Sequence, residues 1–189
     1  MYLFFDTETT GLPKNWKASV ENTDNWPRMI QIAWMLYDKT GKKLDSKDFI
    51  IKPKGFVIPA ESTKIHGITT EIAKEKGNDL RYVLALFGDY INRSSILVAH
   101  NIKFDEMIVG AEFIRENMES KLFRKERVCT MVGSRDYCNI TGPYGLKWPT
   151  LSELHIKLFG EDFQNAHDAY SDISATARCF WELKELNVL

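Results

Sequence analysis

The sequence predicts an α/β domain with a mixed β-sheet, and the order of its apolar patterns carries this prediction. Three strand-like stretches come first and are joined by short connections, which favours an antiparallel set. Helical spacing and strand-like runs then alternate toward the C-terminus. Strands followed by alternating helices and strands are typical of an α/β domain.

The three early strands are expected at Tyr2–Asp6, Ile30–Tyr37 and Asp48–Ile51. The first is an apolar run of strand length, and the other two are rich in residues that favour strands. Asp38–Gly41 has the composition of a turn and separates the second strand from the third.

Helical spacing begins with Asp79–Ile91, where apolar residues recur every three or four positions. Ile96–Ala99 is a continuous apolar run suited to a central strand. Phe104–Phe113 is expected to be helical, and Val128–Met131 is expected to form another strand.

Two helices are predicted near the C-terminus. Thr150–Glu153 matches a capping box, which opens a helix that should end near Gly160. A longer helix is expected from Asp168 to Leu186. Its core-facing stripe consists of Ile173, Ala177, Phe180 and Leu183.

Length and composition predict one globular domain over residues 1–189, since 44% of the residues are hydrophobic. No stretch approaches the roughly 20 apolar residues of a membrane span, and the N-terminus lacks the basic leader of a signal peptide. The cysteines are odd in number and form no CxxC pair, so we expect reduced thiols in a cytoplasmic protein. They are Cys129, Cys138 and Cys179.

The charge balance argues against a protein that coats duplex nucleic acid. The formal net charge is −1 and the isoelectric point is near 6.4, whereas duplex binders carry a strong basic excess. An enzyme that grips only a strand end does not need that excess. The densest basic run, Lys121–Arg127, is either a solvated face or a patch that contacts phosphate.

Two carboxylates lie at the end of the first expected strand. Asp6 and Glu8 are two residues apart, so their side chains project from the same face. Neighbouring carboxylates repel each other unless they share a cation. Oxygen ligands suit Mg²⁺ and Mn²⁺, so this pair predicts a divalent metal site.

Two further segments complete a set of three motifs. Ala99–Asp105 ends in Phe-Asp after an asparagine, and His167–Asp172 reads His-x-Ala-x-x-Asp. With Asp6–Gly11, these motifs resemble those of the DEDDh (DnaQ-like) exonucleases, the family that includes the proofreading epsilon subunit of bacterial DNA polymerase III. The related tyrosine branch would need a tyrosine at position 168, which is Asp168 here.

The resemblance implies a ribonuclease H-like fold, with three antiparallel strands, then two parallel ones, and helices on both faces of the sheet. It also implies hydrolysis with two divalent ions, Mg²⁺ or Mn²⁺. Asp6 would bridge the ions, Glu8 and Asp172 would hold one, and Asp105 would hold the other.

His167 is the expected general base, because an imidazole accepts protons at physiological pH. An ideal helix would turn His167 and Asp172 about 140° apart. We therefore expect His167 just ahead of the last helix, and Asp172 in its opening turns. Taken alone, His167 could be an ordinary surface histidine.

The resemblance also implies contacts to the terminal nucleotide from Glu61 and His66, in a His-Gly-Ile segment, and from Thr7 and Thr9. Without the resemblance, His66 before Gly67 would be read as part of a turn.

The implied activity is 3′-to-5′ exonuclease action on DNA, which releases nucleoside 5′-monophosphates in proofreading or repair. A DNA polymerase is a candidate partner, although the chain ends directly after its last expected helix and is equally expected to act alone. RNA trimming and a catalytically silent nucleic-acid-binding module remain open as alternatives. No motif distinguishes single-stranded from paired ends.

The long segment Pro13–Pro27 leaves the strand that carries the first carboxylates. Its two tryptophans, Trp16 and Trp26, could stack on bases or could pin the segment to the body of the domain.

Overall fold

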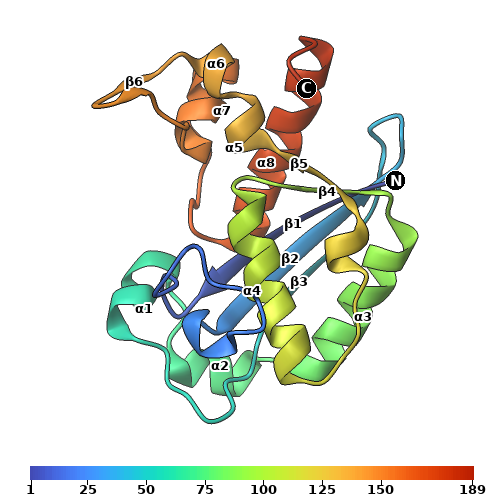
Figure 1. The fold of residues 1–189 in the computed structure, drawn as a ribbon, viewed down its shortest axis with the longest axis vertical. Helices are drawn as coiled ribbons and strands as arrows, with labels where there is room; N and C mark the ends of the chain where they lie inside the picture. Colours follow the sequence, from blue (N-terminus) through green and yellow to red (C-terminus); the bar gives the residue numbers. More distant parts are fainter.

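The computed structural model describes all 189 residues and contains a five-stranded mixed sheet in the order β3-β2-β1-β4-β5 (Figure 1). β1–β2 and β2–β3 are antiparallel, whereas β1–β4 and β4–β5 are parallel, so the predicted mixed sheet is confirmed. The strands are β1 (Tyr2–Thr9), β2 (Met29–Tyr37), β3 (Lys43–Ile50), β4 (Ile96–Ala99) and β5 (Glu126–Cys129).

Six helices of at least seven residues accompany the sheet, together with short helical turns and a small hairpin. The longer helices are α1 (Ala60–His66), α2 (Thr70–Lys76), α3 (Leu80–Arg93), α4 (Ile102–Arg115), α7 (Leu151–Phe159) and α8 (Ala169–Glu185). The short elements are η1 (Thr23–Asn25), η2 (Leu122–Arg124), α5 (Thr130–Gly133), α6 (Arg135–Cys138), β6 (Thr141–Gly142) and β7 (Gly145–Leu146). None of the helices combines the length and apolar character that a membrane crossing requires.

Helices cover both faces of the sheet, because β1 is central and apolar on both sides. Phe4 contacts Phe180 of α8, with ring centroids 5.1 Å apart, and the next residue, Phe5, contacts Phe87 of α3 at 5.5 Å. Adjacent strand residues point to opposite faces. The central strand is therefore fixed from both sides by buried aromatic rings.

The predicted helix boundaries follow from their caps. Thr150 and Glu153 form the expected capping box, and Gly160 ends α7 in the left-handed region with φ of 76°. The side chain of Asp168 accepts the backbone N–H of Ser171 at the start of α8. These side chains satisfy backbone groups that a helix end leaves without partners.

Two strand predictions need correction. β3 begins at Lys43 rather than Asp48, because it is an edge strand without buried residues and therefore lacks an apolar pattern. β5 occupies Glu126–Cys129, and the chain turns into α5 at Thr130, so Met131 is helical rather than extended.

The long segment between β1 and β2 is fixed to the body by partly buried polar contacts. The Trp26 side chain is buried, and its indole N–H donates to the carbonyl of Ser19. Arg115 of α4 donates to the carbonyls of Thr23 and Trp26 at 2.6 and 2.7 Å. Trp26 therefore pins the segment to the domain.

A single buried carboxylate organises these contacts. Glu112 of α4 is fully buried, and its Oε1 lies 2.9 Å from Arg28 Nε and 2.9 Å from Arg115 Nη1. The same oxygen accepts the backbone N–H of Met29. One side chain thus links α4, the long segment and the start of β2.

We expect Glu112→Ala to lower the free energy of unfolding by about 3 kcal/mol, because it leaves two partly buried guanidinium groups without their carboxylate. Urea denaturation followed by circular dichroism measures this. The matched control is Glu161→Ala, since Glu161 forms an exposed ion pair with Arg178 that is worth about 1 kcal/mol or less. Equal losses in the two variants would contradict the role of Glu112.

Candidate active site

The end of β1 presents Asp6 and Glu8 to a cleft of about 500 Å³. Both side chains are partly exposed, whereas Thr7 and Thr9, which alternate with them, are buried. Alternation along the strand therefore separates the acidic positions from the buried ones.

Asp105 reaches the same cleft from the first turn of α4. Asn101 has a left-handed backbone, with φ of 70° and ψ of 45°, which turns the chain directly from β4 into α4. The Asp105 side chain is buried, and its Oδ1 accepts the backbone N–H of Thr7 at 3.1 Å and the Thr7 hydroxyl at 2.8 Å. These two bonds fix the orientation of this carboxylate.

His167 and Asp172 enter from the start of α8. His167 precedes the helix with φ of 69°, and its backbone N–H donates to both carboxylate oxygens of Asp172 at 3.2 and 3.3 Å. Its side chain is exposed. One ligand atom each from Glu8, His167 and Asp172 lies within 4.8 Å of the others. The histidine is thus placed ahead of the helix, as its spacing from Asp172 predicts.

The structure brings all five residues of the three motifs to this cleft. Its lining consists of Asp6, Thr7, Glu8, His100, Asn101, Phe104, Asp105, Met131, Trp148, Pro149, Thr150, Leu151, His167 and Asp172. The four carboxylates come from β1, α4 and α8, which lie far apart in the sequence (Figure 1).

Burial and mutual repulsion raise the pKa of each carboxylate. The pKa of Asp6 lies well above its ordinary value because of burial and then the charge of Asp105. Burial, then Asp172, raises the pKa of Glu8 to about 8. Burial raises the pKa of Asp105 to about 7 although the Thr7 bonds oppose it, and raises that of Asp172 to about 6.

None of the four carboxylates forms an ion pair with a lysine or arginine, although other acidic residues of the protein do. Four carboxylates that share one cleft with no cationic side chain are a donor set that suits hard divalent cations with oxygen ligands. The residues present therefore fit the divalent metal ions expected from the sequence.

A smaller pocket of about 230 Å³ adjoins the cleft and shares Thr7, Glu8 and Phe104 with it. Thr9 and His66 also line this pocket. The Nδ1 atom of His66 accepts the backbone N–H of Ile68, and burial lowers the pKa of the imidazole.

Glu61 is placed differently from the other three residues expected at the terminal nucleotide. It is exposed in the first turn of α1 and does not line this pocket. Ser62 and Ile65 of the same helix line it instead.

Sequence reasoning left several residues of the cleft wall without a role. His100 is half-buried, and its Nε2 lies 3.1 Å from the carbonyl of Pro149 while its Nδ1 lies 3.0 Å from Thr130 Oγ1. Burial lowers the pKa of His100 to about 4, so the ring is neutral and Nε2 carries the proton that Pro149 accepts. This contact fixes Trp148–Thr150 beside the carboxylates. In the sequence, the Trp148–Pro149 pair directly before the capping box was the feature that could have pointed to this part of the cleft wall.

Comparison with known proteins identifies the family. The sequence profile of the RNase_T family, described as exonuclease, matches residues 3–180. The chain belongs to this exonuclease family. The family expected from the three motifs is therefore confirmed, and with it the assignment to the nucleases, which are hydrolases.

Individual relatives are larger proteins. The chain is 34% identical over 118 residues to the PolC-type DNA polymerase III of Mycoplasmopsis pulmonis (strain UAB CTIP), a match that covers 62% of the chain and 7% of the polymerase. E. coli exonuclease I in complex with a dT13 oligonucleotide superimposes with a TM-score of 0.76 at 22% identity, over 97% of this chain and 40% of that one.

A zinc-bound complex of E. coli exonuclease I with single-stranded DNA gives a TM-score of 0.76 at 23% identity, over 98% of this chain and 40% of that one. The exonuclease thus spans less than half the length of these relatives. The likeness of the folds confirms the expected ribonuclease H-like architecture.

The raised carboxylate pKa values predict an unusual dependence of stability on pH. In EDTA, the four carboxylates bind more protons in the folded exonuclease than in the unfolded chain between about pH 4 and pH 8, and together they outweigh the opposing shifts of His66 and His100, so stability falls as pH rises through this window. We expect the Tm in EDTA to be several degrees lower at pH 8 than at pH 5.5. Adding Mn²⁺ should raise the Tm more at pH 8 than at pH 5.5. Differential scanning calorimetry measures both.

Asp105→Asn should raise the Tm in EDTA at pH 8, because it removes one of the repelling charges, and should weaken the response to Mn²⁺. A Tm in EDTA that rises from pH 5.5 to pH 8 in the wild type would contradict this account of the cleft.

Thr7→Val should weaken divalent-ion binding about 10-fold or more, because ligand orientation by a neighbouring hydrogen bond is typically worth 10–100-fold in affinity. Isothermal titration with Mn²⁺ measures it. Thr176→Val is the matched control, since Thr176 is equally buried and its hydroxyl has no hydrogen-bond partner. Similar affinities for the two variants would show that the Thr7–Asp105 bond does not orient a ligand.

Proposed function

We propose that this exonuclease hydrolyses DNA from the 3′ end with divalent metal ions and releases nucleoside 5′-monophosphates. One observation carries the proposal: four carboxylates without a cationic partner line one cleft, with an exposed histidine at its rim. The three-motif pattern of the DEDDh branch supports the polarity. The oligonucleotide in the exonuclease I complex supports DNA as the substrate.

Asp6, Glu8, Asp105 and Asp172 would hold two divalent ions, Mg²⁺ or Mn²⁺. Such ions stabilise the charge that develops on the phosphate oxygens and lower the pKa of water. Thr7 contributes by holding Asp105 in place. The zinc-bound state of E. coli exonuclease I supports a divalent ion in this fold.

His167 would accept the proton of the attacking water. Its side chain is exposed, so it can pass that proton to bulk solvent after each turnover. Its backbone N–H holds Asp172, which couples the position of the base to that of a carboxylate. The left-handed backbone places His167 outside the helix, where the side chain can turn toward substrate.

The adjoining pocket is suited to the terminal nucleotide. Thr7, Thr9 and His66 would contact it there, and contact from the exposed Glu61 stays a prediction. The last phosphodiester bond would then lie beside the carboxylates, because the pocket and the cleft share Thr7 and Glu8.

We further propose that residues 1–189 form one exonuclease domain that serves proofreading or repair. The similarity to a PolC-type polymerase supports a DNA polymerase as partner. Pull-down of a replicative polymerase by the exonuclease tests this association separately from catalysis.

The activity is tested by a time course on 5′-labelled single-stranded DNA with Mg²⁺ or Mn²⁺. We expect a ladder that shortens from the 3′ end, no ladder in EDTA or with Asp172→Asn, and a loss of about 10²–10⁴-fold in kcat with His167→Gln. Matched RNA and duplex substrates are run in parallel. If only the RNA substrate gives a ladder, the substrate is RNA rather than DNA. If the wild type is inactive with both metals, a catalytically silent binding module is favoured.

A further inference from the structure

An apolar hollow of about 560 Å³ lies beside the cleft, outside the site described so far. It is lined by Trp16, Asn101, Ile102, Lys103, Cys129, Met131, Val132 and Trp148. Trp16 and Trp148 keep 46% and 58% of their surfaces exposed. Large exposed aromatic surface next to an active site is typical of a binding surface.

The hollow is continuous with the cleft. Asn101, Met131 and Trp148 line both, just as Thr7, Glu8 and Phe104 line both the cleft and the smaller pocket. Three hollows therefore follow one another, with the carboxylates in the middle one. A strand whose terminal nucleotide fills the smaller pocket would continue from the carboxylates into the apolar hollow.

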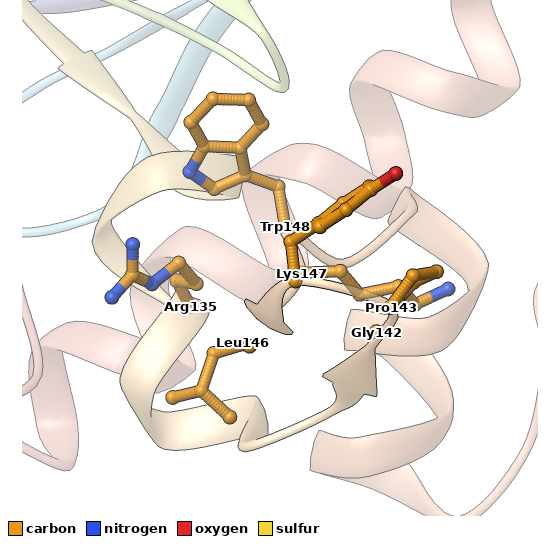
Figure 2. A pocket seen from close by; sticks show the side chains of 8 residues that line it. Arg135, Gly142, Pro143, Leu146, Lys147 and Trp148 are labelled. Carbon is orange, nitrogen blue, oxygen red and sulfur yellow. The ribbon is translucent and has the colours of Figure 1, made fainter.

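The Trp16 ring and the backbone next to Trp148 are held by the body of the domain. The Trp16 ring packs on Phe104, with centroids 5.8 Å apart, and its loop is tied down through Trp26 and Arg115. Trp148 precedes Pro149, whose carbonyl is bound by His100. In Figure 2 the Trp148 indole points away from Leu146 of the β6–β7 hairpin.

The chemistry of the lining favours nucleobases over a peptide. Flat indole faces stack on any base, and the lining contains a lysine, Lys103, but no acidic residue that would repel phosphate. Lys147 and Arg135 line a neighbouring hollow together with Trp148 (Figure 2), where they form ion pairs with Glu153 and Asp136.

We propose that this hollow binds unpaired bases of the substrate strand on the 5′ side of the terminal nucleotide, by stacking on Trp16 and Trp148. The inference rests on the proposed 3′-exonuclease activity and deepens it, because it makes single-stranded 3′ ends the preferred substrate class. In a duplex the faces of the bases are already stacked and cannot reach the indoles.

The test compares steady-state kinetics on dT2, dT4 and dT8 with Mn²⁺. For Trp16→Ala and Trp148→Ala we expect KM on dT8 to rise about 5- to 150-fold, the range that loss of one stacked base implies. The rise should grow with length from dT2 to dT8, with a smaller change in kcat. Trp16→Phe and Trp148→Phe, which retain a flat ring, should recover most of the loss.

Tyr82→Ala is the control for loss of an exposed aromatic ring. Tyr82 lies on α3, is 57% exposed and lines none of the three hollows. The double variant of Trp16 and Trp148 should also lose the preference of the wild type for single-stranded over blunt duplex DNA, measured as the ratio of kcat/KM values.

A second substrate separates this inference from the proposed function. The p-nitrophenyl ester of thymidine 5′-monophosphate has no nucleotide on the 5′ side. Its cleavage by the wild type therefore reports phosphodiester hydrolysis without any contribution from the hollow. If the wild type cleaves the ester but the Trp16→Ala and Trp148→Ala variants match it at every oligonucleotide length, the hollow binds no bases. If the wild type cleaves neither ester nor oligonucleotide, the proposed function fails and the inference with it.

Discussion

The repulsion among four carboxylates that meet at the end of one central strand is the constraint around which this exonuclease is organised. Burial and like charge both disfavour the ionised forms, so an apo cleft of this kind destabilises the fold as its carboxylates lose their protons. The surrounding structure must supply that stability. It does so with aromatic packing on both faces of β1, through Phe180 on one side and Phe87 on the other.

The same packing sets the chemistry of the cleft. α8 is positioned by its contacts with β1 and β2, and its first turn therefore delivers Asp172 to the end of the sheet. α4 begins directly after β4 because Asn101 accepts a left-handed backbone, which places Asp105 against Thr7. Each carboxylate is thus located by the end of a secondary-structure element rather than by a loop, and rigid supports of this kind favour a preorganised site.

Much of this arrangement was predictable from the sequence, since buried elements carry strong patterns. The central strands, α3, α7 and α8 follow from apolar spacing and caps, and the three motifs follow from their resemblance to the DEDDh exonucleases. The prediction made β3 too short, because an edge strand does not need an apolar face. It placed Met131 in a strand rather than a helix, because a short apolar run fits either. The hollow beside Trp148 was not predictable, because it depends on two indoles that lie more than 100 residues apart.

The central position of β1 has a consequence for the assembly of the sheet. Asp6 pairs with Ala33, and the pairing with β2 becomes irregular only between Glu8 and Thr9. Because side chains alternate with a period of two, slippage by one residue would turn Asp6 and Glu8 toward the opposite face and put Phe5 and Thr7 on the face that the two carboxylates now occupy. Capture of a divalent ion during refolding would therefore report the moment at which β1 reaches its native alignment.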